Sequence, residues 1–179
     1  MESSTNSVHI QPATPTRIWS YWPIAFLYLV SAVLALYTVQ LQAYPDYMSH
    51  VMGFVLVLFG LIKLADIAGF AAGFAQYDPL AKKSMTYAQV YPFLEIFLGV
   101  LFILQLLVLP ATLVTLIIYS VSLWGALQSV RNKEALHCVC VGTYFKLPLS
   151  TVTILEAGFM IGMCLWMLVL FNSMVVMVM

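Results

Sequence analysis

The residues best suited to chemistry are two thiols one position apart, Cys138 and Cys140, which follow His137 and precede Gly142. Residues at this spacing can bring their Cα atoms into the disulfide range of about 4.4–6.8 Å, although the short ring is strained. Strained disulfides are easily reduced and tend to be labile rather than structural. His137 and nearby cations favour the thiolate, which is the nucleophilic form. A reversible thiol–disulfide pair is therefore the first hypothesis for this segment.

Two other interpretations of the same segment stay open. Soft thiolate ligands suit Cu(I), Hg(II) or Zn(II), and His137 adds a third local ligand to Cys138 and Cys140. Cu(I) or Hg(II) would need only the two sulfurs, whereas a closed zinc site would need a fourth ligand from elsewhere. In the remaining interpretation, the cysteines pack beneath helix ends and carry no chemistry.

A second group consists of four charged residues inside apolar stretches: Lys63, Asp66, Glu95 and Glu156. Charged side chains are costly in lipid and usually pair or face the interior of a bundle. Lys63 and Asp66 are three residues apart on one helical face, so we expect them to be able to pair. All four are expected at similar depth, in a partly buried polar cluster. Such a cluster either fixes helix packing or relays the protons that thiol oxidation or metal binding releases.

The elements that hold these residues are predicted from composition. The chain has 179 residues, of which 63% are hydrophobic and 8% charged, and its mean hydropathy is +1.00. Soluble domains carry about 25% charged residues, so the chain is predicted to be an integral membrane protein in contact with a lipid bilayer. The net charge is zero, and with no basic run there is no indication of a nucleic-acid partner.

Five apolar stretches are long enough to cross a bilayer as helices, because one crossing takes about 20 residues. Pro110 divides what would otherwise be a single apolar run, so residues 109–112 are predicted to form a tight hairpin. The fold class predicted is an all-α integral membrane protein with five spans, at residues 18–42, 51–75, 91–109, 112–130 and 151–179.

The ends of the apolar stretches carry further signals. Residues 1–17 are rich in Ser, Thr and Pro and are predicted to be disordered. Residues 18–42 are too long for the apolar core of a signal peptide, so we expect them to be retained as a helix. Cys164 lies inside the last apolar stretch and is expected to be a packing residue. Two small-residue patterns predict close helix packing, Gly69-x-x-x-Gly73 and Gly158-x-x-x-Gly162.

The cations predict the orientation in the membrane. If all five spans cross, the N-terminus shares one side with residues 76–90 and 131–150. That side carries six cations and the other carries none; the six are Arg17, Lys82, Lys83, Arg131, Lys133 and Lys146. The positive-inside rule then places the N-terminus and the cysteine segment in the cytoplasm and the C-terminus in the periplasm of a bacterial inner membrane.

A series of motifs runs through the last four predicted spans. In order, they are Phe59-Gly60-x-x-Lys63, Phe70, Phe74, Tyr77, Tyr91-Pro92-x-x-Glu95-x-x-x-Gly99 and Cys138-x-Cys140-x-Gly142. By these motifs the chain from Gly53 to Glu156 resembles the DoxX-like membrane proteins, most closely the MauE branch associated with methylamine utilisation. The resemblance implies a four-helix transmembrane bundle over residues 51–179, with residues 18–42 as an additional N-terminal transmembrane helix.

The resemblance also implies a function. MauE-like proteins are thought to support thiol–disulfide chemistry while a periplasmic partner matures, and they are distantly similar to the vitamin K epoxide reductase bundle. By this resemblance Cys138 and Cys140 would be the redox pair, with Lys63 and Glu95 as intramembrane polar positions. The chain departs from the reductase pattern because it has no second cysteine pair to shuttle electrons. The positive-inside count also places the cysteine pair on the cytoplasmic side of the membrane, whereas the client would be periplasmic.

These interpretations differ in cofactor and partner. A redox role would involve a thioredoxin- or glutaredoxin-like protein and, for electron transfer, a quinone. A metal role would involve a soft metal ion and a metallochaperone, and either form could be a homo-oligomer. A third class, a non-catalytic membrane partner or small-molecule transporter, ranks lower because no inverted repeat or pair of broken helices is visible. Phosphate-binding glycine loops, HExxH and GxSxG are absent.

Overall fold

The computed structural model describes residues 22–40, 47–131 and 149–178, and this part of the chain folds into helices with no strand. Five of the helices are long and apolar enough to cross a membrane. The predicted class, an all-α membrane protein with five spans, is thus confirmed. The helices are α1 (Trp22–Val39), α2 (Tyr47–Ala65), α3 (Ile67–Tyr77), α4 (Met85–Ile103), α5 (Val108–Arg131) and α6 (Leu149–Val178).

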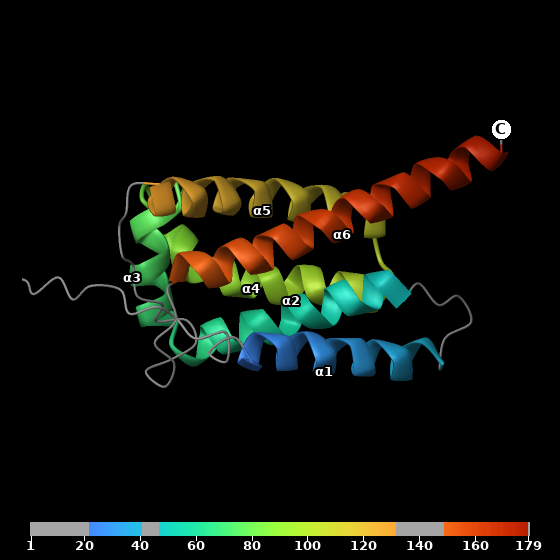
Figure 1. Ribbon diagram of the computed structural model, residues 1–179, viewed down its shortest axis with the longest axis horizontal. Helices are drawn as coiled ribbons and strands as arrows, with labels where there is room; N and C mark the ends of the chain where they lie inside the picture. The colour runs from blue at the N-terminus through green and yellow to red at the C-terminus, as the bar shows by residue number, and fades with distance from the viewer. Residues whose placement is uncertain (1–21, 41–46, 132–148, 179) are drawn as a thin grey trace, which may run out of the picture.

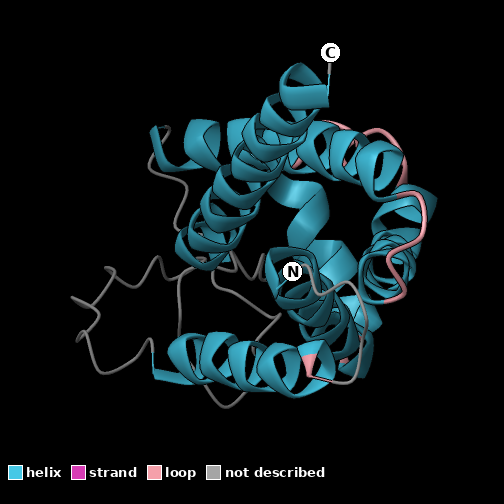
Figure 2. Ribbon diagram, turned by 90° about the vertical axis from the view of Figure 1, so that its right-hand side faces the viewer, coloured by secondary structure: helices cyan, strands magenta, loops and turns pink. Residues whose placement is uncertain are grey.

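The five long helices run side by side, and the short α3 lies across one end of them (Figure 1). At that end α1, α4 and α6 begin, whereas α2 and α5 finish there. The C-terminal part of α6 continues past the opposite end of the bundle. Figure 2, viewed from the end opposite α3, shows only helices and the loops that join them.

The closest helix pair is α2 and α4, because glycines let their backbones touch. A Cβ atom added to Gly53 would lie 2.8 Å from the carbonyl oxygen of Gly99. A Cβ atom added to Gly60 would lie 3.0 Å from the carbonyl oxygen of Pro92. Lys63 follows Gly60 by about one helical turn, and Glu95 precedes Gly99 by about one turn. The contact therefore places Lys63 and Glu95 on facing surfaces.

The predicted continuous span over residues 51–75 is wrong, because the helix breaks at Asp66. The Asp66 carboxylate accepts a hydrogen bond of 3.0 Å from the backbone N–H of Gly69 and so caps α3. Aspartate favours such caps because its side chain satisfies a backbone donor that has no partner within the helix. The 19 residues of α2 already extend about 28 Å, which is close to the bilayer core.

The predicted hairpin at residues 109–112 is also misplaced. The turn lies at residues 104–107, where Gln105 and Leu107 have positive φ angles of 55° and 50°. Pro110 falls in the first turn of α5, which begins at Val108. The first backbone N–H groups of a helix have no acceptor within it, so a proline there costs no hydrogen bond. At the other end of α4, Ser84 caps the helix, which therefore starts before the predicted residue 91.

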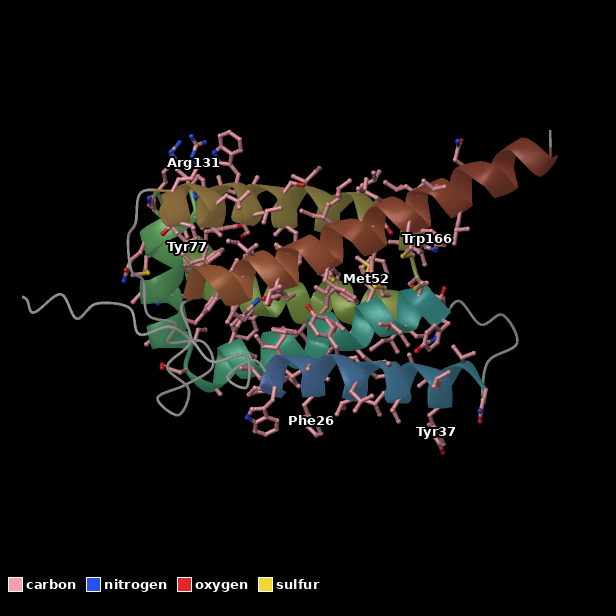
Figure 3. All side chains as sticks on the ribbon, viewed as in Figure 1. Phe26, Tyr37, Met52, Tyr77, Arg131 and Trp166 are labelled. Atoms are coloured by element: carbon pink, nitrogen blue, oxygen red, sulfur yellow. The ribbon has the colours of Figure 1, made fainter. Side chains whose placement is uncertain are left out.

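The outer surface of the bundle is apolar. Phe26 and Tyr37 point away from it on α1 (Figure 3) and are 54% and 66% exposed. Large apolar side chains are exposed in the same way on α4, α5 and α6. Helices satisfy their own backbone hydrogen bonds, so such faces are stable against lipid.

Candidate functional site

An ion-paired lysine lies buried inside the bundle, toward the α3 end, and joins three helices. The Nζ atom of Lys63 on α2 is 2.5 Å from Oε1 of Glu95 on α4. The same Nζ atom is 2.8 Å from Oε1 of Glu156 on α6. The three residues are only 6%, 1% and 3% exposed. Buried charges of this kind need complete pairing, because little water reaches them.

Tyr119 on α5 adds a fourth helix to the group. Its hydroxyl oxygen is 2.7 Å from Oε1 of Glu95 and 3.0 Å from Oε1 of Glu156. We call Lys63, Glu95, Tyr119 and Glu156 the Lys63 cluster. The sequence interpretation did not include Tyr119, although a hydroxyl-bearing residue in an apolar stretch is a signal for it. The cluster thus ties α2, α4, α5 and α6 together.

Aromatic rings surround the ammonium group of Lys63. Its Nζ atom lies 5.3 Å from the ring centre of Tyr91, 5.6 Å from that of Phe70 and 5.9 Å from that of Phe59. The negative face of an aromatic ring attracts a cation at these distances, most strongly where water is excluded. Phe70 comes from α3, so the short helix completes the enclosure. The rings thereby replace part of the hydration that Lys63 loses.

The Lys63 cluster combines one ammonium group with two carboxyl groups and one hydroxyl group. With both carboxyl groups ionised, two negative charges would face a single positive one, which is costly in a buried site. A tyrosine hydroxyl has one hydrogen to donate, yet that of Tyr119 approaches both carboxyl oxygens. A proton on either carboxyl group would make the cluster neutral.

A small cavity adjoins the cluster. Its enclosed void is about 20 Å³, which is room for about one water molecule. The walls are mainly aliphatic and aromatic, and α1 contributes to them as well as the other five helices. The lining residues include Pro23, Ile24 and Leu27 of α1, Phe59 and Lys63 of α2, Phe70 and Phe74 of α3, Tyr91 of α4, Tyr119 and Ser122 of α5, and Val152, Thr153 and Glu156 of α6.

Asp66, the other charged residue considered from the sequence, takes a different place. It is exposed and caps α3, whereas the ion pairs of Lys63 are made with Glu95 and Glu156. The spacing of Lys63 and Asp66 favours a pair only on one continuous helix, and the helix breaks between them. The structure therefore brings together three of the four residues.

The candidate thiol pair and its neighbouring histidine, Cys138, Cys140 and His137, lie outside the described residues, so their roles stay predictions. Cys164 is a free thiol on α6 and is buried in the core, as expected of a packing residue. In the part of the chain that the structure describes, no three His, Cys, Asp or Glu side chains are grouped to hold a metal ion.

Comparison with known proteins gives one match. The family model described as methylamine utilisation protein MauE matches residues 41–170, which is most of the chain. The matched range contains the whole Lys63 cluster and the cysteine segment but leaves out α1. No curated protein and no solved structure matches the chain.

Proposed function

The chain belongs to the MauE family of methylamine utilisation proteins, and from this membership we propose that it is a membrane accessory protein that exchanges thiols and disulfides with a partner. Cys138 and Cys140 are the redox pair in this proposal. A thioredoxin- or glutaredoxin-like protein is the partner, and a quinone is the final electron acceptor. The Lys63 cluster serves as the proton site.

The observation that carries the proposal is the pairing of one lysine with two buried carboxyl groups, Glu95 and Glu156, in the Lys63 cluster. Oxidation of two thiols to a disulfide releases two electrons and two protons, and the protons need an acceptor within reach. Glu156 lies seven residues after Leu149, the first residue of α6, so it is about 10 Å along that helix. The cysteine segment connects Arg131 with Leu149. Both of these residues lie at the α3 end. Leu149 precedes Glu156 by about two turns, whereas Arg131 follows Tyr119 by more than three turns, or about 18 Å.

The reaction balances without any further reactant. In the first step a partner dithiol reduces the Cys138–Cys140 disulfide: that sulfur–sulfur bond breaks, the partner disulfide forms, and two electrons and two protons pass to Cys138 and Cys140. In the second step a quinone oxidises Cys138 and Cys140 back to the disulfide and is reduced to a quinol, which takes up the two electrons and two protons. In both steps Glu95 or Glu156 holds one proton in transit, while Lys63 keeps the site neutral.

Titration of the thiols tests the redox role. The full-length protein in detergent is equilibrated with dithiothreitol buffers of graded potential, and free thiols are counted by maleimide labelling. We expect one two-electron transition that disappears in Cys138→Ser and in Cys140→Ser. Cys164→Ser serves as the control and should leave the transition unchanged, because that thiol is buried in the core. Stoichiometric Cu(I), Hg(II) or Zn(II) retained after dialysis, with no reversible disulfide, would overturn the redox proposal in favour of metal binding by Cys138, Cys140 and His137.

Infrared spectroscopy tests the proton role. The difference spectrum between reduced and oxidised protein should contain the C=O stretch of a protonated carboxyl group. Glu95→Gln and Glu156→Gln should each abolish this band, whereas Asp66→Asn should retain it, because Asp66 is exposed at the start of α3. A difference spectrum without a carboxyl band would show that the cluster does not exchange protons with the thiols.

A further inference from the structure

Helix α1 covers the cavity although it lies outside the range that matches the family. That range begins at residue 41, whereas α1 ends at Val39. Pro23, Ile24 and Leu27 of α1 nevertheless form one wall of the cavity beside the Lys63 cluster. The outer face of α1 is exposed, as expected for a surface in lipid. The four-helix core would therefore present this cavity to the bilayer if α1 were elsewhere.

Helices α2 and α6 pack against each other less closely than α2 and α4 do. Tyr28 of α1 bridges them, since its ring centre is 5.8 Å from that of Phe59 on α2 and 4.5 Å from that of Phe159 on α6. The Tyr28 hydroxyl is buried without a hydrogen-bond partner among the described residues. Buried polar groups are nearly always hydrogen-bonded, so a donor of this kind is a candidate for contact with a ligand or a water molecule.

The chemistry of the walls limits what could bind. Phe59, Phe70 and Tyr91 provide ring faces that favour a flat ring. Glu156 disfavours an anion, and Lys63 already occupies the place of a cation. Tyr119 lines the cavity, and Tyr28 packs against the lining residue Phe59, so a tyrosine hydroxyl can meet a neutral oxygen. A neutral ring that carries carbonyl or hydroxyl oxygens and dissolves in the bilayer meets all of these conditions.

We propose that the opening between α2 and α6, beneath α1, is the lateral entrance and binding site for a quinone from the bilayer. The enclosed void of about 20 Å³ is too small for a ring, since a cavity of about 150 Å³ is what holds benzene. The ring therefore enters when the Tyr28 side of α1 moves off Phe159. In the site a carbonyl oxygen accepts from Tyr28 or from the Lys63 cluster. The use of this quinone as electron acceptor rests on the proposed thiol function, but its binding does not.

Photolabelling tests the site. The full-length protein in phosphatidylcholine vesicles is irradiated with an azido-benzoquinone that carries one isoprenyl unit, and labelled peptides are identified by mass spectrometry. We expect labels on the cavity-lining parts of α1, α2 and α6, and competition by unlabelled quinone of the same tail. An azido-alkane of equal length should label the lipid-facing side of α4 instead, at residues such as Phe93 and Phe97, which are 54% and 60% exposed.

Variants of α1 make the result specific. Ile24→Trp fills the cavity and should reduce labelling by about tenfold or more, the usual effect of a steric change in an apolar pocket. Leu27→Phe also fills the cavity but adds less volume, so it provides the same test if Ile24→Trp fails to fold. Phe26→Trp lies on the exposed face of the same helix and should leave labelling unchanged. Phe159→Ala removes the contact with Tyr28 and should speed labelling.

The outcomes separate this inference from the thiol proposal. If the wild type shows no redox transition, the thiol proposal is overturned. If Cys138→Ser is still labelled in that case, the quinone site stands. Labelling confined to the exposed faces, or equal in wild type, Ile24→Trp and Leu27→Phe, would overturn the quinone site. In that second case an intact two-electron transition of the thiols would still support the proposed function.

Discussion

At the scale of single residues, Lys63 shows how this protein keeps charges inside a membrane. Its ammonium group is bound by two carboxyl oxygens and faced by three aromatic rings. Removing one member of a buried ion pair costs more than the pair contributes, because the remaining charge loses its compensation. The two carboxyl groups therefore depend on Lys63 as much as the lysine depends on them.

The Lys63→Met variant tests this dependence. We expect the free energy of unfolding to fall by about 3–5 kcal/mol, since Glu95 and Glu156 would then face each other without a cation. Lys82→Met is the control, because Lys82 is exposed and such substitutions stay within about 0.5 kcal/mol. The measurement is reversible unfolding in mixed micelles, followed by circular dichroism.

A double-mutant cycle adds the pairwise part of the effect. Glu95→Gln should lower the free energy of unfolding less in the Lys63→Met background than in the wild type, because the ion pair is already absent from that background. Equal costs in the two backgrounds, or a Lys63→Met protein as stable as Lys82→Met, would contradict the ion pairs of the Lys63 cluster.

At the scale of helices, the contact between α2 and α4 positions the site. Gly53, Gly60 and Gly99 bring the two backbones together. Lys63 and Glu95 each lie about one helical turn from one of these glycines, so the close contact places them opposite each other. In lipid there is no hydrophobic force between helices, so small residues and close packing hold them together. The site therefore depends on residues that carry no chemistry themselves.

Two glycine substitutions separate packing from helix propensity. Gly99→Ala places a Cβ atom 2.7 Å from the carbonyl oxygen of Gly53, so we expect a loss of about 1–3 kcal/mol from overpacking. Gly158→Ala has nothing within 4 Å of its new Cβ atom and should stabilise α6 by about 0.5–1 kcal/mol. Thermal unfolding of both variants in the same detergent provides the comparison. Similar shifts for the two would refute the close contact of α2 with α4.

At the scale of the whole molecule, the helix ends separate into two groups. The α3 end carries Lys82, Lys83 and Arg131, and Figure 3 shows Arg131 at that end of α5. The turn between α4 and α5, at the other end, contains no cation. By the positive-inside rule we propose that the α3 end faces the cytoplasm.

Labelling of introduced cysteines tests this arrangement in intact cells. In a background without Cys138 and Cys140, Lys83→Cys and Arg131→Cys should both resist a membrane-impermeant maleimide added outside. Leu106→Cys, which is in the exposed turn between α4 and α5, should react with it, and the background protein is the control. If only one of Lys83→Cys and Arg131→Cys reacted with the maleimide, the order of the spans would be contradicted. If both reacted and Leu106→Cys did not, the orientation would be inverted.

The sequence by itself determined the class of protein, the number of spans and three members of the site. Apolar composition and run length are local properties, and a bilayer selects for them directly. Lys63, Glu95 and Glu156 stand out for the same reason, since each is a charge inside an apolar stretch. The family also follows from local motifs, and the match over residues 41–170 confirms it.

Only the tertiary structure decided which of these residues meet. Lys63 binds Glu156, 93 residues away, while Asp66, three residues away, caps the next helix. Glycines at residues 53, 60 and 99 form a close contact, whereas Gly158 and Gly162 face open space. The physical reason is that a membrane helix is apolar on every face, so its periodicity does not reveal which face turns inward. Helix rotation and crossing, and the position of α1 over the cavity, follow from packing between residues far apart in the chain.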